Sequence, residues 1–275
     1  MTLATLNDVL KPAVVGHYAL AGLVVLGWED ALAYVQAAED VGVAIILQAG
    51  PGCRKYMPVS ILGKMFRVLA EQAKIPVVCH IDHAKTVAEC VAGIESGFTS
   101  VMIDGSALNL SANIALTREV VALAHKQGIS VEGEVGVVGY SGGRASTGTA
   151  PEEAARFERE TKVDALAISV GNVHLQTEKS AVIDFAALKA IENVTSVPLV
   201  LHGGSGIDAQ VRRHLSREYR VKKFNIGTEL RMAFGKALRR HLNETSLAFD
   251  RLDILGSTVE PVRQAAVQVL MSFSK

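Results

Sequence analysis

The sequence predicts an α/β fold, a (β/α)8 barrel of the TIM type with an additional C-terminal helix. Two observations lead to this prediction. Short apolar, β-branched segments alternate with longer amphipathic segments eight times, which is the pattern of parallel strands connected by helices. The length of 275 residues is ordinary for one barrel. An open doubly wound sheet has the same periodicity, but eight repeats fit a closed barrel better.

The elements are expected in this order. The strands are the near-continuous apolar runs at residues 13–18, 43–48, 76–81, 100–104, 130–135, 165–170, 198–202 and 222–226. The helices are the amphipathic segments between them, at residues 28–40, 60–74, 84–96, 112–127, 151–161, 185–192, 208–216 and 228–245. A ninth helix, at 259–273, lies outside the eight-fold count. Because no linker or low-complexity tract interrupts the chain, we expect residues 1–275 to form a single domain.

The composition argues against nucleic acids and membranes as binding partners. The 28 basic and 28 acidic residues balance, so no overall field favours nucleic acid or an anionic membrane. No apolar run reaches the roughly 18 residues that span a bilayer, and the N-terminus lacks the pattern of a signal peptide. The three cysteines have no CxxC spacing, which indicates reduced thiols. We therefore expect a cytoplasmic protein with a small-molecule substrate.

Polar residues collect where the expected strands end. In a barrel these ends meet on one face, where the loops after the strands form the active site. In chain order the residues are His80, Asp82, His83, Asp104, Glu132, Glu134, His174, His202, Gly203, Ser205, Asn225, Gly227 and Thr228.

Three of these residues predict a metal site. A single histidine at a strand end is usually a hydrogen-bonded structural residue, but His83, His174 and His202 end three different strands. Three imidazoles with a nearby carboxylate suit a tetrahedral zinc ion with one open position. Strand alternation would turn His80 away from His83, so His80 is expected to be structural or to support a ligand. Asp82 adjoins a ligand, where a carboxylate can exchange protons with a bound hydroxyl or orient the histidine.

Two glycine-rich segments complete the expected site. The HGGSG run at residues 202–206 and the NIGT run at 225–228 follow the last two strands, where barrels frequently bind phosphate on backbone N–H groups. Residues 137–149 contain four glycines and few bulky side chains. We expect them to form a loop over the site that is poorly ordered without ligand.

These residues, in this order, resemble the class II (metal-dependent) fructose-bisphosphate and tagatose-bisphosphate aldolases. The stretch VCHIDHAKTVAECVAGIESGFTSVMIDGS at residues 78–106 is similar to the family's sequence nearly throughout, and so are residues 113–117, 131–136, 164–171, 201–207 and 225–231. The resemblance implies a zinc-dependent lyase that performs reversible aldol cleavage of a ketose (bis)phosphate or a closely related ketose.

The resemblance also implies a role for each matched residue. Zinc would be held by His83, His174 and His202, with Glu134 as an alternate ligand. Asp82 would donate and accept the proton of the reacting hydroxyl. Asp104 and Glu132 would support the ligands or lie near a second cation, monovalent or divalent. The phosphate or hydroxyls of the ketone half would be held by Gly203, Ser205, Asn225, Gly227 and Thr228. By analogy with the fold, the ninth helix suggests a homodimer or homotetramer.

Several positions depart from the family pattern. Ala84 and Leu175 replace glycines, and Glu178 stands where the family has a phosphate-contacting lysine, with Lys179 beside it. The loop at 139–144 lacks the family's acidic residues, and Gly50 replaces a serine. The alternatives are therefore an aldolase for an unphosphorylated ketose or a sugar acid, and a metal-binding subunit without catalytic activity. If Glu178 occupies the lysine's place, bisphosphate substrates should be used weakly.

Overall fold

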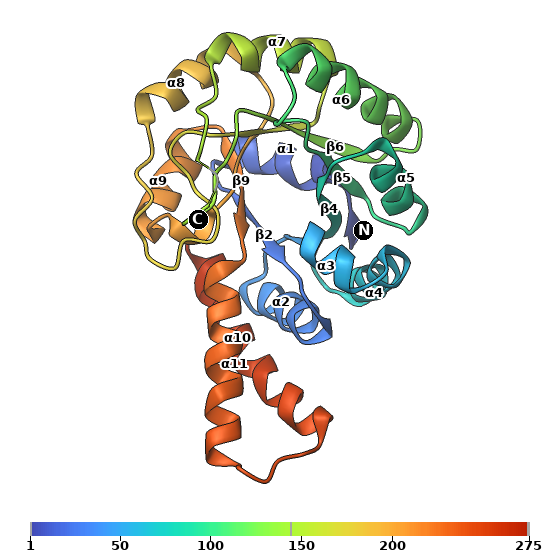
Figure 1. Cartoon of the computed structure of the whole chain (residues 1–275), viewed down its shortest axis with the longest axis vertical. Helices are drawn as coiled ribbons and strands as arrows, with labels where there is room; N and C mark the ends of the chain where they lie inside the picture. Colours follow the sequence, from blue (N-terminus) through green and yellow to red (C-terminus); the bar gives the residue numbers. More distant parts are fainter. Residues whose placement is uncertain (1, 144, 274–275) are drawn as a thin grey trace.

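The structure, a computed structural model, describes residues 2–143 and 145–273. Eight parallel strands form a closed barrel with helices outside it (Figure 1), as predicted. The order around the barrel is β4-β3-β2-β9-β8-β7-β6-β5, and β5 pairs with β4 to close it. The strands are β2 Leu20–Val24, β3 Ile45–Ala49, β4 Val77–Ala84, β5 Ser100–Ile103, β6 Ser130–Val135, β7 Ala165–Ile168, β8 Leu199–Leu201 and β9 Val221–Ile226.

The helices between the strands follow the expected alternation. They are α2 Trp28–Val41, α4 Val59–Gln72, α5 Val87–Glu95, α6 Leu110–His125, α7 Pro151–Thr161, α8 Phe185–Val194, α9 Ala209–Glu218 and α10 Thr228–Glu244. Two further segments were not predicted, the short helix α3 Pro51–Tyr56 and a 3-10 turn at Gly204–Gly206. None of the described helices is long and apolar enough to cross a membrane.

The first expected strand was wrong. Residues 13–18 lie at the end of helix α1 (Leu6–Gly16) and in the turn after it, and the first barrel strand is β2. The helix begins at a capping box between Thr5 and Asp8. Its apolar face packs against side chains inside the barrel, among them Ile46, Val78 and Val200. In Figure 1 it lies across the middle of the ring of helices. The apolar run therefore closes the barrel's N-terminal end instead of entering the sheet. A two-residue strand before it, β1 (Leu3–Ala4), pairs with β4.

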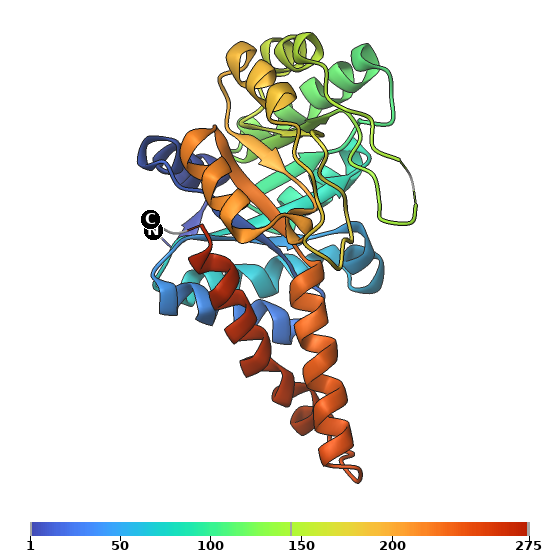
Figure 2. The ribbon, with the colours of Figure 1, turned by 90° about the vertical axis from the view of Figure 1, so that its left-hand side faces the viewer.

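The last helix is longer than expected. Helix α11 runs over Arg251–Met271 and returns along α10, so that the two project from the barrel as an arm (Figure 2). An ion pair between Arg263 and Asp40, 2.7 Å long, ties α11 to α2. At the far end of the arm three apolar side chains are 82–94% exposed, Leu247, Phe249 and Leu252.

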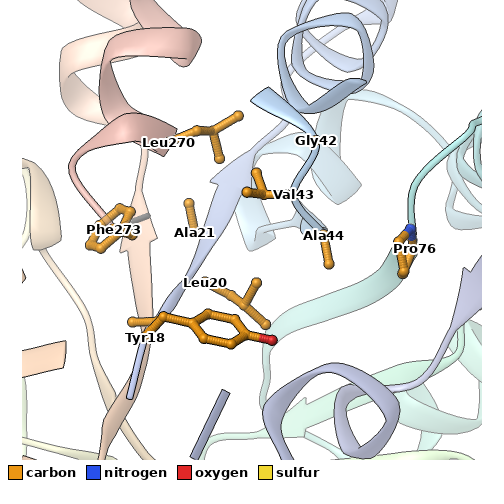
Figure 3. A pocket seen from close by; sticks show the side chains of 10 residues that line it. Tyr18, Leu20, Ala21, Gly42, Val43, Ala44, Pro76, Leu270 and Phe273 are labelled. Atoms are coloured by element: carbon orange, nitrogen blue, oxygen red, sulfur yellow. The ribbon is translucent and has the colours of Figure 1, made fainter. Parts of the chain in front are cut away.

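One cavity opens at the N-terminal ends of the strands, away from the predicted site. It has a volume of about 500 Å³ and lies between the starts of β2 and β3 and the end of α11. Figure 3 shows that its walls are almost wholly apolar, with Tyr18, Val43, Leu270 and Phe273 among them. Its lining lacks a cluster of ionisable groups, and the predicted site lies at the opposite, C-terminal end of the barrel.

Candidate metal centre and active site

Three histidines meet at the C-terminal face of the barrel. His83 comes from β4, His174 from the segment after β7 and His202 from the residue after β8. Their ring centroids lie 4.6–5.6 Å apart, and one nitrogen of each lies within 4.8 Å of the others. Residues up to 119 positions apart in the chain, from His83 to His202, are therefore brought to one point.

A backbone irregularity turns His83 into this cluster. His80 and Asp82 share a face of β4 with Val78, which packs inside the barrel, so simple alternation would point His83 outward. Instead the pairing of β4 with β5 shifts between Ile81 and Ala84, and His83 has a φ of 54°. This left-handed conformation costs a non-glycine residue about 1–3 kcal/mol. Side chains of β4 therefore stop alternating between the two faces of the strand at His83, and the His83 side chain joins the cluster.

Arg54, on α3, holds the irregular end of β4. Its guanidinium donates to the carbonyl oxygens of Asp82, at 2.6 Å, and of His83, at 3.2 Å. It also donates to the carbonyl of Ala49 and forms a 3.2 Å ion pair with Glu89. Sequence reasoning missed Arg54, because nothing in its spacing indicates a contact with main-chain oxygens 28 and 29 residues away.

Two carboxylates orient two of the histidines. Asp104 accepts a 2.8 Å hydrogen bond from Nδ1 of His83, and Glu132 accepts a 3.1 Å bond from Nε2 of His202. The opposite ring atoms, Nε2 of His83 and Nδ1 of His202, are buried and lack a hydrogen-bond partner among the described residues. The same holds for Oε2 of Glu134. Unsatisfied buried polar atoms are costly in a native protein, and a metal ion at their meeting point would satisfy them. The residues present therefore fit a divalent metal ion.

The protonation of the cluster in the metal-free protein follows from burial and neighbouring charge. Burial lowers the pKa of His83, but the carboxylates of Asp82, Asp104 and Glu134 outweigh it and raise that pKa to about 9. Burial, with the charge of His83, lowers the pKa of His174 to about 4. Burial is also the main reason why the pKa of Glu134 rises to about 8.

Asp104 has further partners that sequence reasoning did not foresee. It accepts hydrogen bonds from the backbone and hydroxyl of Ser106, at 3.1 and 2.7 Å, and it contacts the Lys85 ammonium. A second set of three possible ligands, His83, Asp104 and Glu134, also has suitable spacing. In that set Lys85 already neutralises Asp104.

Asp82 lies beside the histidines and is held by two amides. Its Oδ1 accepts hydrogen bonds from Gln48, at 2.9 Å, and from Asn225, at 3.1 Å. The tight fit of Gln48 requires glycine at position 22, where a Cβ would lie 1.8 Å from its Oε1. Burial raises the pKa of Asp82, but the charges of His83, His202 and Lys223 outweigh it and lower that pKa overall.

A small polar cavity of about 60 Å³ adjoins Asp82 and His174. Its other lining residues are Val24, Leu175, Gly203, Ser205, Asn225, Gly227, Thr228 and Arg231. The expected anion-binding residues are thus together. Gly203 has a φ of 65°, and a Cβ there would lie 2.1 Å from the carbonyl oxygen of Val173. The hydroxyl of Ser205 accepts from the backbone N–H groups of Gly227 and Glu229, both at 3.3 Å, at the start of α10.

Lys179, not Glu178, reaches this cavity's wall. The Lys179 ammonium donates to the carbonyl of Ser205 at 2.8 Å and pairs with Glu229 at 2.7 Å. Arg212, almost fully buried, pairs with the other oxygen of Glu229 at 2.6 Å. Glu178 is exposed and does not line the cavity. The cations Lys179 and Arg212 therefore lie beside the wall of the anion site, and the carboxylate of Glu178 does not, contrary to what the resemblance to the family suggested.

The loop at residues 137–149 folds back over His174. Its backbone pairs at Val137 and Thr147 and again at Tyr140 and His174, and the ring of Tyr140 stacks on that of His174 with centroids 4.8 Å apart. Arg144 lies outside the described residues. Whether the loop is poorly ordered without ligand remains a prediction.

Comparisons with known proteins agree with the geometry. The family model described as fructose-bisphosphate aldolase class-II matches residues 4–275. A fructose-bisphosphate aldolase of Geobacillus stearothermophilus is 33% identical over 99% of this chain and 97% of its own length. A 6-phospho-5-dehydro-2-deoxy-D-gluconate aldolase of Halalkalibacterium halodurans is 37% identical over 91% of this chain and 88% of its own.

A solved structure is similar as well. The crystal structure of the YdjI aldolase from Escherichia coli K12 has a TM-score of 0.88 and 30% identity, and it covers 99% of this chain and 97% of that chain. Family model, relatives and fold point the same way. The chain belongs to the class II fructose-bisphosphate aldolases, a family of metal-dependent aldehyde-lyases that catalyse reversible aldol cleavage.

Proposed function

We propose that this chain is a zinc-dependent aldolase for a ketose phosphate, with the zinc on His83, His174 and His202 and with Asp82 as the group that moves the proton. The observation that carries the proposal is the meeting of three features at one end of the barrel. These are the unpartnered ring nitrogens, a carboxylate held by two amides and a polar cavity at the start of α10.

The ligand atoms follow from the hydrogen bonds. With Nδ1 of His83 bound to Asp104 and Nε2 of His202 bound to Glu132, the metal ligands are Nε2 of His83 and Nδ1 of His202, together with a ring nitrogen of His174. Glu134 is the alternate ligand. Three imidazoles favour zinc among common divalent ions. When bound, the ion supplies Lewis-acid polarisation of the substrate carbonyl. Because Lys85 contacts Asp104, we assign Asp104 to orienting His83 instead of binding a second cation.

Asp82 is suited to exchange a proton with a substrate hydroxyl. Gln48 and Asn225 fix its Oδ1, and its lowered pKa keeps it ionised near neutral pH. During cleavage it accepts the proton of the hydroxyl on the carbon that becomes the aldehyde. In the reverse direction it returns that proton. Asn225 therefore serves the site twice, as a donor to Asp82 and as a wall of the cavity.

The cavity at the start of α10 is suited to a phosphate on the ketone half. Backbone N–H groups at Gly203, Ser205 and Thr228 and the positive end of the helix favour an anion. The Lys179 ammonium and the Arg231 side chain add positive charge there. The related aldolases are named for fructose bisphosphate and for a phosphorylated sugar acid, so both compounds are candidate substrates.

A second candidate is a ketose or sugar acid without phosphate on the ketone half. Leu175 favours it, because this residue, with a φ of 58°, lines the cavity at a position where the family has glycine. A bulky side chain there reduces the room for a phosphate.

Deuterium exchange decides between these substrates. The zinc-loaded protein is mixed with dihydroxyacetone phosphate or dihydroxyacetone in heavy water, and loss of the α-proton signal is followed by NMR. Faster exchange of the phosphate supports the leading proposal, and exchange of dihydroxyacetone alone supports the second. Bound zinc with no exchange of either would contradict both and indicate a non-catalytic subunit.

We also propose that the protein is a homodimer or homotetramer and acts in the cytoplasm. The exposed apolar end of the arm, Leu247, Phe249 and Leu252, is the kind of surface that another subunit covers. The three cysteines are unpaired and buried, as is usual for reduced proteins of the cytosol. Light scattering of the purified protein tests the first point, with a monomer at micromolar concentration as the contradicting result.

A further inference from the structure

Two neighbouring lysines of β9 are buried on opposite sides of the strand. Lys222 is 2% exposed and its ammonium donates to the carbonyl of Ser216, in α9 outside the barrel. Lys223 has no exposed surface, and its ammonium lies inside the barrel, 2.8 Å from Oε2 of Glu132. A buried ammonium is costly unless it is paired. The pair with Glu132, which is also fully buried, meets this requirement.

Glu132 connects this pair to the metal centre. Its Oε2 accepts from Lys223, and its Oε1 accepts the 3.1 Å hydrogen bond from Nε2 of His202. A neutral imidazole carries one N–H, so a proton held on Nε2 leaves the lone pair on Nδ1. Nδ1 of His202 is one of the buried atoms of the metal cluster that lack a hydrogen-bond partner among the described residues. The hydrogen bond to Glu132 therefore leaves Nδ1 of His202 available to the metal.

The two oxygens of Glu132 are held separately, Oε1 by His202 and Oε2 by Lys223, so the ammonium of Lys223 fixes the carboxylate that orients the His202 ring. Among the described residues, the other basic group within 4 Å of Glu132 is His80, whose Nε2 is 3.7 Å from Oε2 and whose Nδ1 is engaged by Ser100 at 2.8 Å. Lys223 is therefore the fixed cation that faces Glu132.

We infer that Lys223 is a positioning residue for the metal centre. Its ammonium holds the Glu132 carboxylate in place, and the hydrogen bond between Glu132 and His202 in turn fixes the imidazole ring with Nδ1 directed at the metal. This inference rests on the proposed metal site for the identity of the ligand atom. It adds a three-residue connection, Lys223 to Glu132 to His202, from β9 through β6 to the end of β8.

The test is a double-mutant cycle read out as zinc affinity. Competition with a chromogenic chelator at one pH compares the wild type, Lys223→Met, Glu132→Gln and the double variant. Lys223→Met should lower zinc affinity by roughly 10- to 100-fold, the usual effect of losing a group that orients a ligand histidine. In the Glu132→Gln background the same change should alter affinity by less than about threefold, because no carboxylate charge remains to be balanced.

The neighbouring lysine supplies the matched control. Lys222→Met removes an equally buried ammonium from the same strand, on the side away from the metal, and should leave zinc affinity within about threefold of wild type. Equal losses for Lys222→Met and Lys223→Met, or equal losses for Lys223→Met in both backgrounds, would overturn the inference. Wild-type protein that binds no zinc would instead contradict the proposed metal site.

A measurement on the unmodified side chains covers the case in which Lys223→Met does not fold. Histidine ¹⁵N NMR of metal-free wild-type protein reports which ring nitrogen carries the proton, and His202→Gln identifies the His202 signals. The inference requires the proton of His202 on Nε2. A proton on Nδ1 would overturn it.

Discussion

Arg54→Met tests how the irregular end of β4 is held in place. The change keeps most of the aliphatic stem and removes the guanidinium that donates to the carbonyls of Asp82 and His83. A hydrogen bond from a charged donor contributes about 1.5–3 kcal/mol, so these two together contribute about 3–6 kcal/mol. That exceeds the roughly 1–3 kcal/mol cost of the left-handed conformation at His83.

Without Arg54, the end of β4 should therefore relax and His83 should leave the cluster. If the substitution destabilises the metal-binding conformation of His83 by about 3 kcal/mol relative to the relaxed one, zinc affinity drops roughly a hundredfold. Chelator competition measures this loss, and denaturant unfolding of the metal-free protein measures the change in stability.

Glu89→Gln is the matched control for Arg54. It removes the carboxylate charge that pairs with the guanidinium, but the Glu89 side chain is 42% exposed, and exposed ion pairs contribute about 0–1 kcal/mol. Zinc affinity should stay near that of the wild type. If the zinc affinity of Arg54→Met were within about threefold of that of the wild type, the proposal that Arg54 stabilises the conformation of His83 would be refuted.

Three further predictions concern the proton donor, the anion site and pH. Asp82→Ala should retain zinc while kcat falls by about 10²–10⁴, the range for loss of a general acid/base; cleavage near the wild-type rate would reassign the proton transfer. Gly203→Ala should destabilise the protein by more than about 1–3 kcal/mol in denaturant unfolding, because its Cβ would meet the carbonyl of Val173 at 2.1 Å. Gly42→Ala, at a φ of 73° with open space around it, should cost less; equal costs would count against the close contact. Zinc affinity should rise about tenfold per pH unit between roughly pH 6 and 8.5, because the pKa of His83 is about 9 in the metal-free protein and its proton must leave before the ion binds. A flat profile in isothermal titrations over that range would contradict this assignment.

Most of the barrel could be predicted because its strands are buried on both faces. Such strands form short apolar runs, and seven of the eight expected runs overlap the observed strands. The exception, residues 13–18, is also apolar, but it belongs to the end of the helix that covers the barrel's N-terminal opening. A short apolar run has the same composition in either role, so periodicity alone does not separate them.

The candidate site was predictable as a set of residues but not as a geometry. Position at strand ends brings the histidines, carboxylates and glycines to one face. The inward turn of His83 depends on a φ of 54°, which its sequence neighbours do not specify. Likewise, Arg54 and Lys223 act through contacts with residues 28 and 91 positions away, and no local spacing indicates such contacts.

The central claim is that zinc binds the three histidines through specific ring nitrogens. The most direct test is a crystal structure of the zinc-loaded protein with anomalous data collected on both sides of the zinc absorption edge. We predict one strong peak bonded to Nε2 of His83, Nδ1 of His202 and a ring nitrogen of His174. A peak bonded instead to Nδ1 of His83 with Asp104 and Glu134, or no peak at this face, would contradict the account.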